Sequence, residues 1–333
     1  MSVRLGINGF GRIGRYLVRL LASDDDLELV AINARADNAS LAHLFKYDSS
    51  HGTFRGTVDH DDDGLIINGR HIAVTRNRMG EWQWKDFDID VAVETSGTLK
   101  DKAGLLQHLD CGAQKVVISA PCKDADITVV MGVNEEMYNS AKHWVVSAAS
   151  CTTNCLAPVA KTLHDAFGIK HGLMTTIHSY TMSQRILDGS HKDLRRARAA
   201  CVSMIPTTTG AAKATALVIP SLKGKLDGMA VRVPTPNVSL VDFTCELEKP
   251  CTAVAINAAI QAAATGPMKD NLGYCAEPLV SVDFEGSTYG GVVDAMSTMV
   301  LDNNLAKIII WYDNEAGFTN QLARLLRLVG NNM

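Results

Sequence analysis

Val3-Arg-Leu-Gly-Ile-Asn8, followed at once by Gly9-Phe-Gly-Arg-Ile-Gly14, opens the chain with its most specific fold signal. The first six residues predict a buried strand, and a helical pattern of apolar residues follows over residues 15–22. A second apolar strand is expected over residues 27–33. The opening of the chain therefore predicts a β-α-β unit.

Gly9, Gly11 and Gly14 match the GxGxxG fingerprint of dinucleotide-binding turns. In that motif the glycines allow a tight turn, let the backbone approach a pyrophosphate, and permit close packing of helix against strand. A lone match is weak, because glycine-rich turns are common. Here the motif lies between a predicted strand and a predicted helix, which favours a dinucleotide site over a purely structural turn.

The end of the second predicted strand bears on the choice between NAD and NADP. An acid about 20 residues beyond the glycines usually binds the adenosine ribose, but this chain has Ala34 there, followed by Arg35. An acid would repel a ribose 2′-phosphate by roughly 3 kcal/mol at ~5 Å and a dielectric of ~20. Arg35 instead offers a cation to that phosphate, which favours NADP. The alternative is that Arg35 points into solvent and Asp37 serves the ribose.

The composition is ordinary for a globular protein of two domains, with 333 residues, 47% of them hydrophobic and 20% charged. The net charge of −4 argues against a broad nucleic-acid or anionic-membrane surface. No apolar run approaches the roughly 18 residues of a membrane span, and the N-terminus does not resemble a signal peptide. The eight cysteines are scattered without a CxxC pair. We therefore expect reduced thiols in the cytoplasm and neither a disulfide framework nor a metal site.

The rest of the first half alternates strands with helices. Further strands are expected at residues 65–67, 71–75, 91–94, 115–119 and 127–130. This alternation predicts an α/β fold, a Rossmann-type doubly wound parallel sheet, in a dinucleotide-binding domain over residues 1–149.

After Cys151 the runs become longer, and several alternate with period two. They cover residues 173–180, 229–233, 239–247, 279–284, 292–301 and 306–312. We expect an α+β catalytic domain over residues 150–314, with a mostly antiparallel sheet half covered by helices such as one over residues 254–264. A final amphipathic helix over residues 316–329 is expected to return to the first domain, so that residues 315–333 complete it.

Cys151 lies where a short apolar run gives way to a predicted helix. Unpaired backbone N–H groups and the positive end of a helix dipole stabilise thiolate over thiol, and a thiolate of low pKa is a covalent catalyst. The alternative is an inert thiol, since free cysteines are often buried.

A cysteine nucleophile needs a base, and His178 ends the alternating run over residues 173–177. Taken alone, a histidine is more often a core or surface residue. Hydroxyls, backbone N–H groups and arginines that suit phosphate recognition follow it. They are Thr181, the run Arg195-Arg196-Ala197-Arg198, Thr207 to Gly210, and Arg232. The basic run is equally compatible with a solvated face or a subunit contact.

Seven motifs in order resemble the phosphorylating glyceraldehyde-3-phosphate dehydrogenase family over essentially the full length. They are residues 6–14, 46–51, 147–155, 191–198, 209–213, 232–237 and 311–315.

The resemblance implies that Cys151 attacks the aldehyde of glyceraldehyde 3-phosphate and that His178 is the base and then the donor to the hemithioacetal oxygen. Hydride passes to the nicotinamide, and inorganic phosphate cleaves the thioester. It places Thr181 and Arg232 on the substrate phosphate. It places Ser150, Thr152, Arg198, Thr209 and Gly210 around the attacking phosphate, and Arg12, Ile13, Arg78, Ser119 and Asn314 on the cofactor. The family is normally a homotetramer in which the loop around residues 180–203 packs against a neighbouring cofactor site.

Departures from the family pattern point toward NADP. The family's NAD-specific members carry an acid in place of Ala34 and a Leu-Pro pair in place of Gly189-Ser190. Photosynthetic NADP-using members resemble this chain at Ser190, and Ser183 replaces an acid often found near the same pocket.

Two other functions remain as alternatives. Erythrose-4-phosphate dehydrogenases resemble the chain at the cysteine motif but usually depart from residues 209–213, which this chain keeps. A non-catalytic scaffold or RNA-binding role is disfavoured by intact Cys151 and His178 and by the acidic net charge.

Overall fold

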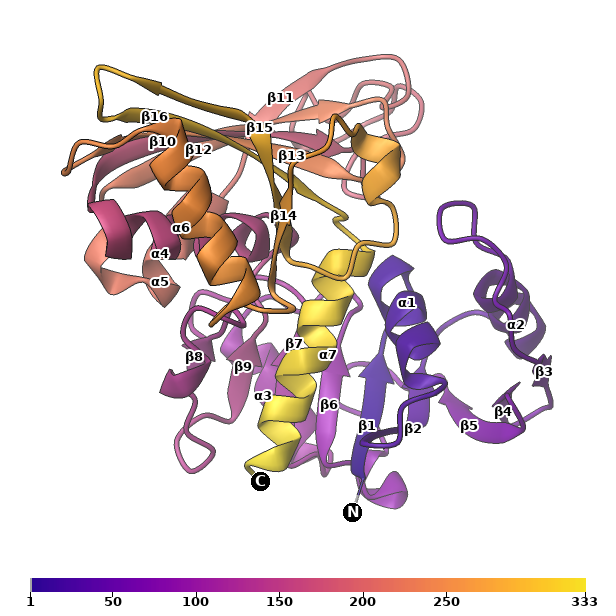
Figure 1. Cartoon of the computed structure of the whole chain (residues 1–333). Coiled ribbons are helices and arrows are strands. Elements are labelled where there is room, and N and C mark those ends of the chain that lie inside the picture. Colours follow the sequence, from indigo (N-terminus) through magenta and orange to yellow (C-terminus); the bar gives the residue numbers. More distant parts are fainter. Residues whose placement is uncertain (1) are drawn as a thin grey trace. The chain divides into compact units, whose positions relative to one another are not determined.

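The computed structural model describes residues 2–333 and divides into two compact units, each built on one sheet (Figure 1). The first unit contains residues 2–129, 135–149 and 322–333, and the second contains residues 130–134 and 150–321. Within residues 2–333 no helix is long and apolar enough to cross a membrane. All eight cysteines are unpaired.

The first unit carries a nine-stranded sheet with the order β3-β4-β5-β2-β1-β6-β7-β9-β8. Its strands are β1 Val3–Asn8, β2 Leu27–Asn33, β3 Val58–His60, β4 Gly64–Ile67, β5 Arg70–Thr75, β6 Val91–Glu94, β7 Lys115–Ile118, β8 Ile127–Thr128 and β9 Val145–Ser147. The accompanying helices are α1 Arg12–Leu21, α2 Asn38–Lys46, α3 Lys102–Asp110 and the 3₁₀ turns η1 Trp84–Phe87 and η2 Glu135–Met137. All pairings from β5 to β8 are parallel, which confirms the predicted doubly wound sheet.

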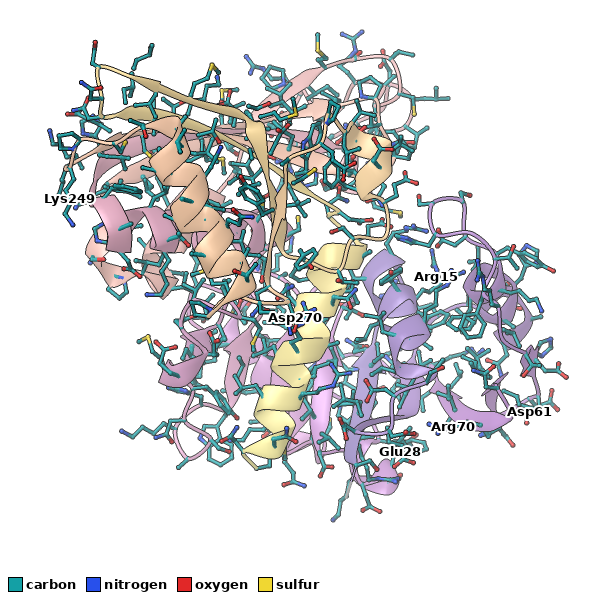
Figure 2. All side chains as sticks on the ribbon, viewed as in Figure 1. Arg15, Glu28, Asp61, Arg70, Lys249 and Asp270 are labelled. Carbon is teal, nitrogen blue, oxygen red and sulfur yellow. The ribbon has the colours of Figure 1, made fainter. Side chains whose placement is uncertain are left out.

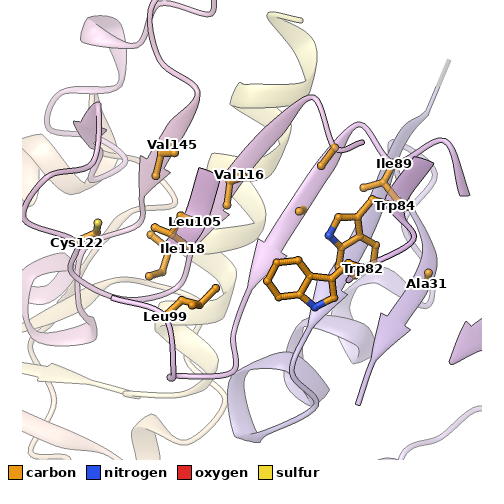
Figure 3. Close-up of a cluster of buried hydrophobic side chains, with 12 residues drawn as sticks. Ala31, Trp82, Trp84, Ile89, Leu99, Leu105, Val116, Ile118, Cys122 and Val145 are labelled. Carbon is orange, nitrogen blue, oxygen red and sulfur yellow. The ribbon is translucent and has the colours of Figure 1, made fainter. Parts of the chain in front are cut away.

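The central strands of this sheet are apolar on both faces because helices and loops cover both. Leu5, Ile7 and Val91 are fully buried, and each such side chain contributes about 1.5–3 kcal/mol by leaving water. Figure 3 shows Trp82 and Trp84 in a buried cluster with residues from β7 and α3. The indole N–H of Trp84 donates to His108 Nδ1 at 2.9 Å, so its one polar atom is satisfied in the core. At the β3–β5 edge, by contrast, Asp61 and Arg70 point outward (Figure 2).

The second unit carries a seven-stranded sheet with the order β11-β12-β10-β13-β16-β15-β14. Its strands are β10 Ile169–Ser179, β11 Ile205–Thr208, β12 Leu226–Val233, β13 Ser239–Leu247, β14 Leu272–Cys275, β15 Gly291–Leu301 and β16 Leu305–Tyr312. Its other elements are α4 Cys151–Phe167, α5 Ala211–Val218, α6 Ala253–Thr265, the 3₁₀ turns η3 Pro220–Leu222 and η4 Ser281–Phe284, and the start of α7 Ala316–Asn331. Four of the six pairings are antiparallel, and β10–β12 and β14–β15 are parallel, so the mostly antiparallel prediction is confirmed.

Helices α4, α5 and α6 lie against one face of the second sheet (Figure 1). On the opposite face the turn η4 covers the end of the sheet, where Phe284 stacks on Trp311 of β16 with ring centroids 5.4 Å apart. Strand β13 shows the result, because its residues alternate between buried and partly exposed along its whole length.

The predicted strand over residues 279–284 is wrong. Residues Ser281–Phe284 form the 3₁₀ turn η4 instead. The Asp283 carboxylate accepts the backbone N–H of Val280 at 2.8 Å, and the Asp283 N–H bonds to the Val280 carbonyl at 3.0 Å. Because these backbone groups are satisfied locally, the segment does not pair with a neighbouring strand.

Candidate active site

Cys151 is the first residue of α4. Ser150 is the N-cap, and its Oγ accepts the backbone N–H of Thr153 at 3.0 Å. The cysteine therefore lies at a helix N-terminus, as the sequence predicted, where the helix dipole is positive. Thr152, which follows it, is buried, and its hydroxyl lies 2.9 Å from the hydroxyl of Tyr312.

His178 faces Cys151 from the end of β10. The distance from Cys151 Sγ to His178 Nε2 is 3.5 Å, which is within reach for hydrogen bonding to sulfur. The imidazole is 5% exposed and meets the ring of Tyr312 edge to face, with centroids 5.9 Å apart. The Tyr312 hydroxyl is held in turn by Thr176 Oγ1 at 2.8 Å. Sequence reasoning assigned no role to Tyr312, because nothing in its spacing links it to the cysteine.

Burial controls the protonation of this pair. Burial, together with the positive charge of Arg232, lowers the pKa of His178 to about 3, so the imidazole is neutral. Burial also raises the pKa of the Cys151 thiol, although Arg232 and hydrogen bonds from Thr152 and the helix N-terminus oppose it. The expected thiolate of low pKa is thus corrected, because desolvation of the enclosed sulfur outweighs these charges and dipoles. The pair consists of a thiol and a neutral base.

The other ring nitrogen of His178 has two neighbours. Nδ1 lies 2.8 Å from the Ser179 carbonyl oxygen and 2.6 Å from Arg232 Nη1. A guanidinium only donates, so its proximity favours a lone pair on Nδ1, whereas the carbonyl favours a proton there. A base that accepts the thiol proton needs its lone pair on Nε2. The Ser179 carbonyl is the group that holds the Nδ1 proton in this base-competent tautomer.

Arg232 has a second arginine near it, and that residue is Arg196. Burial lowers the pKa of Arg232, and the charge of Arg196 lowers it further. Arg196 Nε donates to Thr207 Oγ1 at 2.9 Å. Arg198, which the family resemblance named, instead pairs with Asp188 at 3.1 Å, and both side chains are more than half exposed. The arginine run alone could not distinguish the two residues, because only the folded loop shows which one faces the site. The geometry favours Arg196.

The remaining predicted phosphate ligands lie at the start of a helix or in a loop. Gly210 is the N-cap of α5 without a side-chain cap, and a Cβ there would meet nothing within 4 Å. Thr209 Oγ1 accepts the N–H of Ala211 at 3.2 Å. Thr181 Oγ1 lies 2.8 Å from Ser183 Oγ in the exposed loop that follows β10. A helix N-terminus beside hydroxyls and arginines is suited to an anion.

The three glycines of the first unit differ in what a side chain would meet. A Cβ on Gly9, whose φ is +105°, would lie 2.6 Å from Ser96, and one on Gly14 would lie 2.3 Å from the Gly9 carbonyl. A Cβ on Gly11 would meet nothing within 4 Å. Packing inside the protein therefore explains Gly9 and Gly14 but not Gly11, which is the uncapped N-cap of α1. That pattern fits a turn approached closely by a pyrophosphate.

The other predicted cofactor residues of this unit surround the same strand ends. The guanidinium of Arg12, at the start of α1, binds both carboxylate oxygens of Asp48, at 2.5 and 3.0 Å. Ser119 Oγ donates to the Glu94 carbonyl at 3.0 Å, and Arg78 is exposed.

The residues that follow β2 bear on ribose binding. Ala34 is buried and Arg35 is exposed. Asp37, the alternative ribose ligand, caps α2: one carboxylate oxygen accepts the Ser40 N–H at 2.8 Å and the other accepts the Ser40 hydroxyl at 2.7 Å. Asp37 is exposed, and each of its oxygens keeps a second acceptor site, so the alternative stays open.

Two predicted cofactor residues belong to the second unit. Asn314 is 7% exposed, and its Oδ1 accepts the Ser239 hydroxyl at 2.8 Å. Ser190 is exposed, and its carbonyl accepts two bonds from Arg185, at 2.9 and 3.0 Å.

Comparison with known proteins gives matches along most of the chain. Residues 3–102 match the family described as glyceraldehyde 3-phosphate dehydrogenase, NAD binding domain, and residues 150–314 match its C-terminal domain. A glyceraldehyde-3-phosphate dehydrogenase of Geobacillus stearothermophilus is 53% identical over 332 residues, 99% of each chain. Glyceraldehyde-3-phosphate dehydrogenase 1 of Bacillus cereus is 54% identical over 323 residues, 97% of each chain. Glyceraldehyde-3-phosphate dehydrogenase 2 of Bacillus subtilis (strain 168) is 48% identical over 334 residues, 100% of this chain and 98% of the relative. The chain, with its nicotinamide-binding Rossmann domain and its cysteine–histidine pair, belongs to the glyceraldehyde 3-phosphate dehydrogenase family.

Proposed function

We propose that the protein catalyses the reversible oxidative phosphorylation of D-glyceraldehyde 3-phosphate to 1,3-bisphosphoglycerate. The observation that carries the proposal is the placement of Cys151 Sγ 3.5 Å from the buried, neutral imidazole of His178. Family membership supports the same reaction, because the relatives are named for this dehydrogenase activity. The chemistry is that of a covalent catalyst with an adjacent base.

In the proposed reaction the Cys151 sulfur adds to the aldehyde carbon while its proton passes to His178 Nε2. The imidazolium then donates to the hemithioacetal oxygen. A bound nicotinamide dinucleotide would accept hydride from the hemithioacetal carbon while the hydroxyl proton returns to His178 Nε2, which leaves a thioester on the sulfur. An oxygen of inorganic phosphate then attacks the thioester carbon, the carbon–sulfur bond breaks, and the acyl phosphate leaves while the cysteine sulfur takes the proton back from His178.

Two sets of residues would bind the two phosphates. Thr181 and Arg232 hold the substrate phosphate, and Ser150, Thr152, Thr209 and Gly210 line the site of the attacking phosphate. For the arginine of that second site we assign Arg196 in place of Arg198, since Arg196 neighbours Arg232. Guanidinium forks and helix N-termini are strong phosphate donors.

The decisive experiment compares wild type with Cys151→Ser and His178→Asn on glyceraldehyde 3-phosphate, with and without inorganic phosphate. We expect no turnover without Cys151 and a loss of about 100-fold or more without the base. Activity that survives Cys151→Ser would sink the mechanism. Erythrose 4-phosphate in the same assay tests the nearest alternative, and faster turnover of that aldehyde would replace the assigned substrate.

We further propose that NADP is the preferred cofactor and NAD the weaker one. Ala34 removes the repulsion of a 2′-phosphate, and Arg35 is exposed beside it. Substitution Ala34→Asp should lower kcat/KM with NADP about 100-fold, which corresponds to the roughly 3 kcal/mol of charge repulsion, and should change kcat/KM with NAD much less. Wild-type kcat/KM that is equal or higher with NAD would defeat the preference.

We also propose a homotetramer in the cytoplasm. The outer face of the second sheet exposes large apolar side chains, which are expected to be covered in an assembly. The eight unpaired cysteines support a reducing compartment.

A further inference from the structure

We infer that Ser239 is a positioning residue: it fixes which end of the Asn314 amide faces the cofactor and ties that amide to the segment holding His178. The inference rests on the proposed function, because it assigns Asn314 to the nicotinamide carboxamide. All residues involved belong to the second unit.

Ser239 stands between two partners that together orient its hydroxyl. It is the first residue of β13 and 2% exposed. Its Oγ accepts the backbone N–H of Ser179 at 3.1 Å and donates to Asn314 Oδ1 at 2.8 Å. The hydroxyl oxygen accepts the Ser179 N–H, and its single proton goes to the Asn314 amide oxygen that faces it. The chain of bonds has one direction, from Ser179 through Ser239 to Asn314.

The two ends of the Asn314 amide have different surroundings. Its oxygen is held by Ser239, and its Nδ2 makes no hydrogen bond with any of residues 2–333. The Asn314 side chain therefore presents a donor to the site. A nicotinamide carboxamide carries both an acceptor oxygen and a donor NH₂ group, and this site selects the rotamer that turns the oxygen toward Asn314. A carboxamide held in one rotamer keeps one face of the ring toward the substrate.

Ser179 links the same chain to the base. Its carbonyl lies 2.8 Å from His178 Nδ1, and its own hydroxyl donates to the Val238 carbonyl at 2.6 Å. One residue thus contacts the imidazole through its carbonyl and Ser239 through its N–H. The orientations of the His178 imidazole and of the Asn314 amide therefore both depend on Ser179.

The corner before Ser239 is strained, which shows that the position of this hydroxyl is enforced. Val238 has a φ of +61°, a left-handed conformation that is a genuine outlier for a β-branched residue. It is retained because the side chain packs with Phe284 and Val292 and the carbonyl is bound by Ser179. Asn237, just before it, donates to buried Asp313 at 2.9 Å. The turn is thus fixed by the packing of the Val238 side chain, by the bond to its carbonyl, and by the bond between Asn237 and Asp313.

The first test uses the wild-type protein and two dinucleotides. The 3-acetylpyridine analogue keeps the carbonyl oxygen but lacks the NH₂ group. If Asn314 donates to that oxygen, the analogue should bind within about threefold of the parent dinucleotide in a competition titration. Binding weaker than about tenfold would overturn the assigned amide direction, because it would mean that the missing NH₂ group had been bound.

The second test compares Ser239→Ala with Ser239→Thr and with Thr215→Val, which removes a buried hydroxyl from α5 that bonds only to the Ala211 carbonyl. We expect Ser239→Ala to raise the dissociation constant of the dinucleotide about tenfold and to degrade the stereospecificity of deuteride transfer to the ring. The KM for aldehyde should stay within about twofold, threonine should restore the wild-type values, and Thr215→Val should retain them.

The outcomes distinguish failure of the Ser239 role from failure of the proposed function. If wild type turns over the aldehyde but Ser239→Ala matches Thr215→Val in binding and stereospecificity, Ser239 has no positioning role and only this inference fails. If wild type binds no nicotinamide dinucleotide, or Cys151→Ser stays active, the proposed function itself fails. The analogue titration uses wild-type protein, so it can refute the inference even if Ser239→Ala does not fold.

Discussion

Burial favours the neutral forms of both Cys151 and His178, the pair to which we assign the proposed reaction. The sequence located both residues through the family resemblance and placed the cysteine at a helix start, which the structure shows. It did not foresee that burial raises the pKa of the Cys151 thiol, because desolvation depends on the packing of distant segments around the sulfur. Tyr312, which flanks both residues, was likewise invisible in the spacing of the chain.

The depressed pKa of His178 predicts a pH dependence of stability. The imidazole titrates near 6.5 when unfolded and near 3 when folded, so between these values the unfolded chain binds more protons and stability falls as pH falls. Wild type should lose about 2 kcal/mol more than His178→Asn between pH 7 and pH 5, measured by urea unfolding. Equal losses in the two proteins would show that His178 is not held neutral by the fold.

Arg196 and Arg198 form a matched pair for locating the attacking phosphate. Arg196 neighbours Arg232, whereas Arg198 is exposed and bound to Asp188. Arg196→Gln should raise the KM for inorganic phosphate about tenfold or more, since hydrogen bonds to charged groups contribute about 1.5–3 kcal/mol, and Arg198→Gln should change it little. The comparison is made by initial rates at saturating aldehyde, and the reverse ranking would return the role to Arg198.

At the scale of elements, buried strands were the easiest to predict. β1, β2, β6 and β13 match the predicted boundaries, because continuous apolar runs or strict alternation mark them. The wrong strand over residues 279–284 has the same apolar character, but the Asp283 side chain closes a turn there. The short strands β11 and β14 were missed, since four residues carry too little periodicity. These short strands are defined by their pairing with β12 and β15, which are distant in the sequence.

The start of α1 gives a second matched pair, in which packing and ligand binding separate. A Cβ at Gly14 would lie 2.3 Å from the Gly9 carbonyl, while one at Gly11 would meet nothing within 4 Å. Gly14→Ala should lower the free energy of unfolding by about 1–3 kcal/mol. Gly11→Ala should alter it by less than about 0.5 kcal/mol and should weaken dinucleotide binding. Calorimetric titration and denaturant unfolding of both variants check this, and unchanged dinucleotide affinity in Gly11→Ala would remove the pyrophosphate from this turn.

At the scale of the whole molecule, the face of the second sheet opposite the helices is a feature that a single chain leaves unexplained. Exposed apolar side chains lie on four of its strands, and they are Leu173 on β10, Met229 on β12, Met296, Met299 and Leu301 on β15, and Leu305 on β16. Composition could not reveal this face, because it depends on which sheet face the helices cover.

Charge on that face should disrupt the proposed tetramer. Leu173→Glu combined with Leu301→Glu is expected to shift the mass measured by light scattering from four chains to fewer, because both residues are about two-thirds exposed in the single chain, at 67% and 66%. Val254→Glu is the control, since Val254 is 79% exposed but lies on α6. A mass that stays at four chains would place the contacts elsewhere.

The exposed apolar face of the second sheet also has a practical consequence for kinetic assays of the protein. The proposed tetramer would dissociate on dilution by mass action, so at the nanomolar concentrations of a rate assay the leucines and methionines of this face would be exposed to water and to the vessel walls. Specific activity should then decay after dilution, and a carrier protein in the buffer should preserve it. The measured rate should therefore depend on the protein concentration of the stock and of the assay, and both should be given with the kinetic constants.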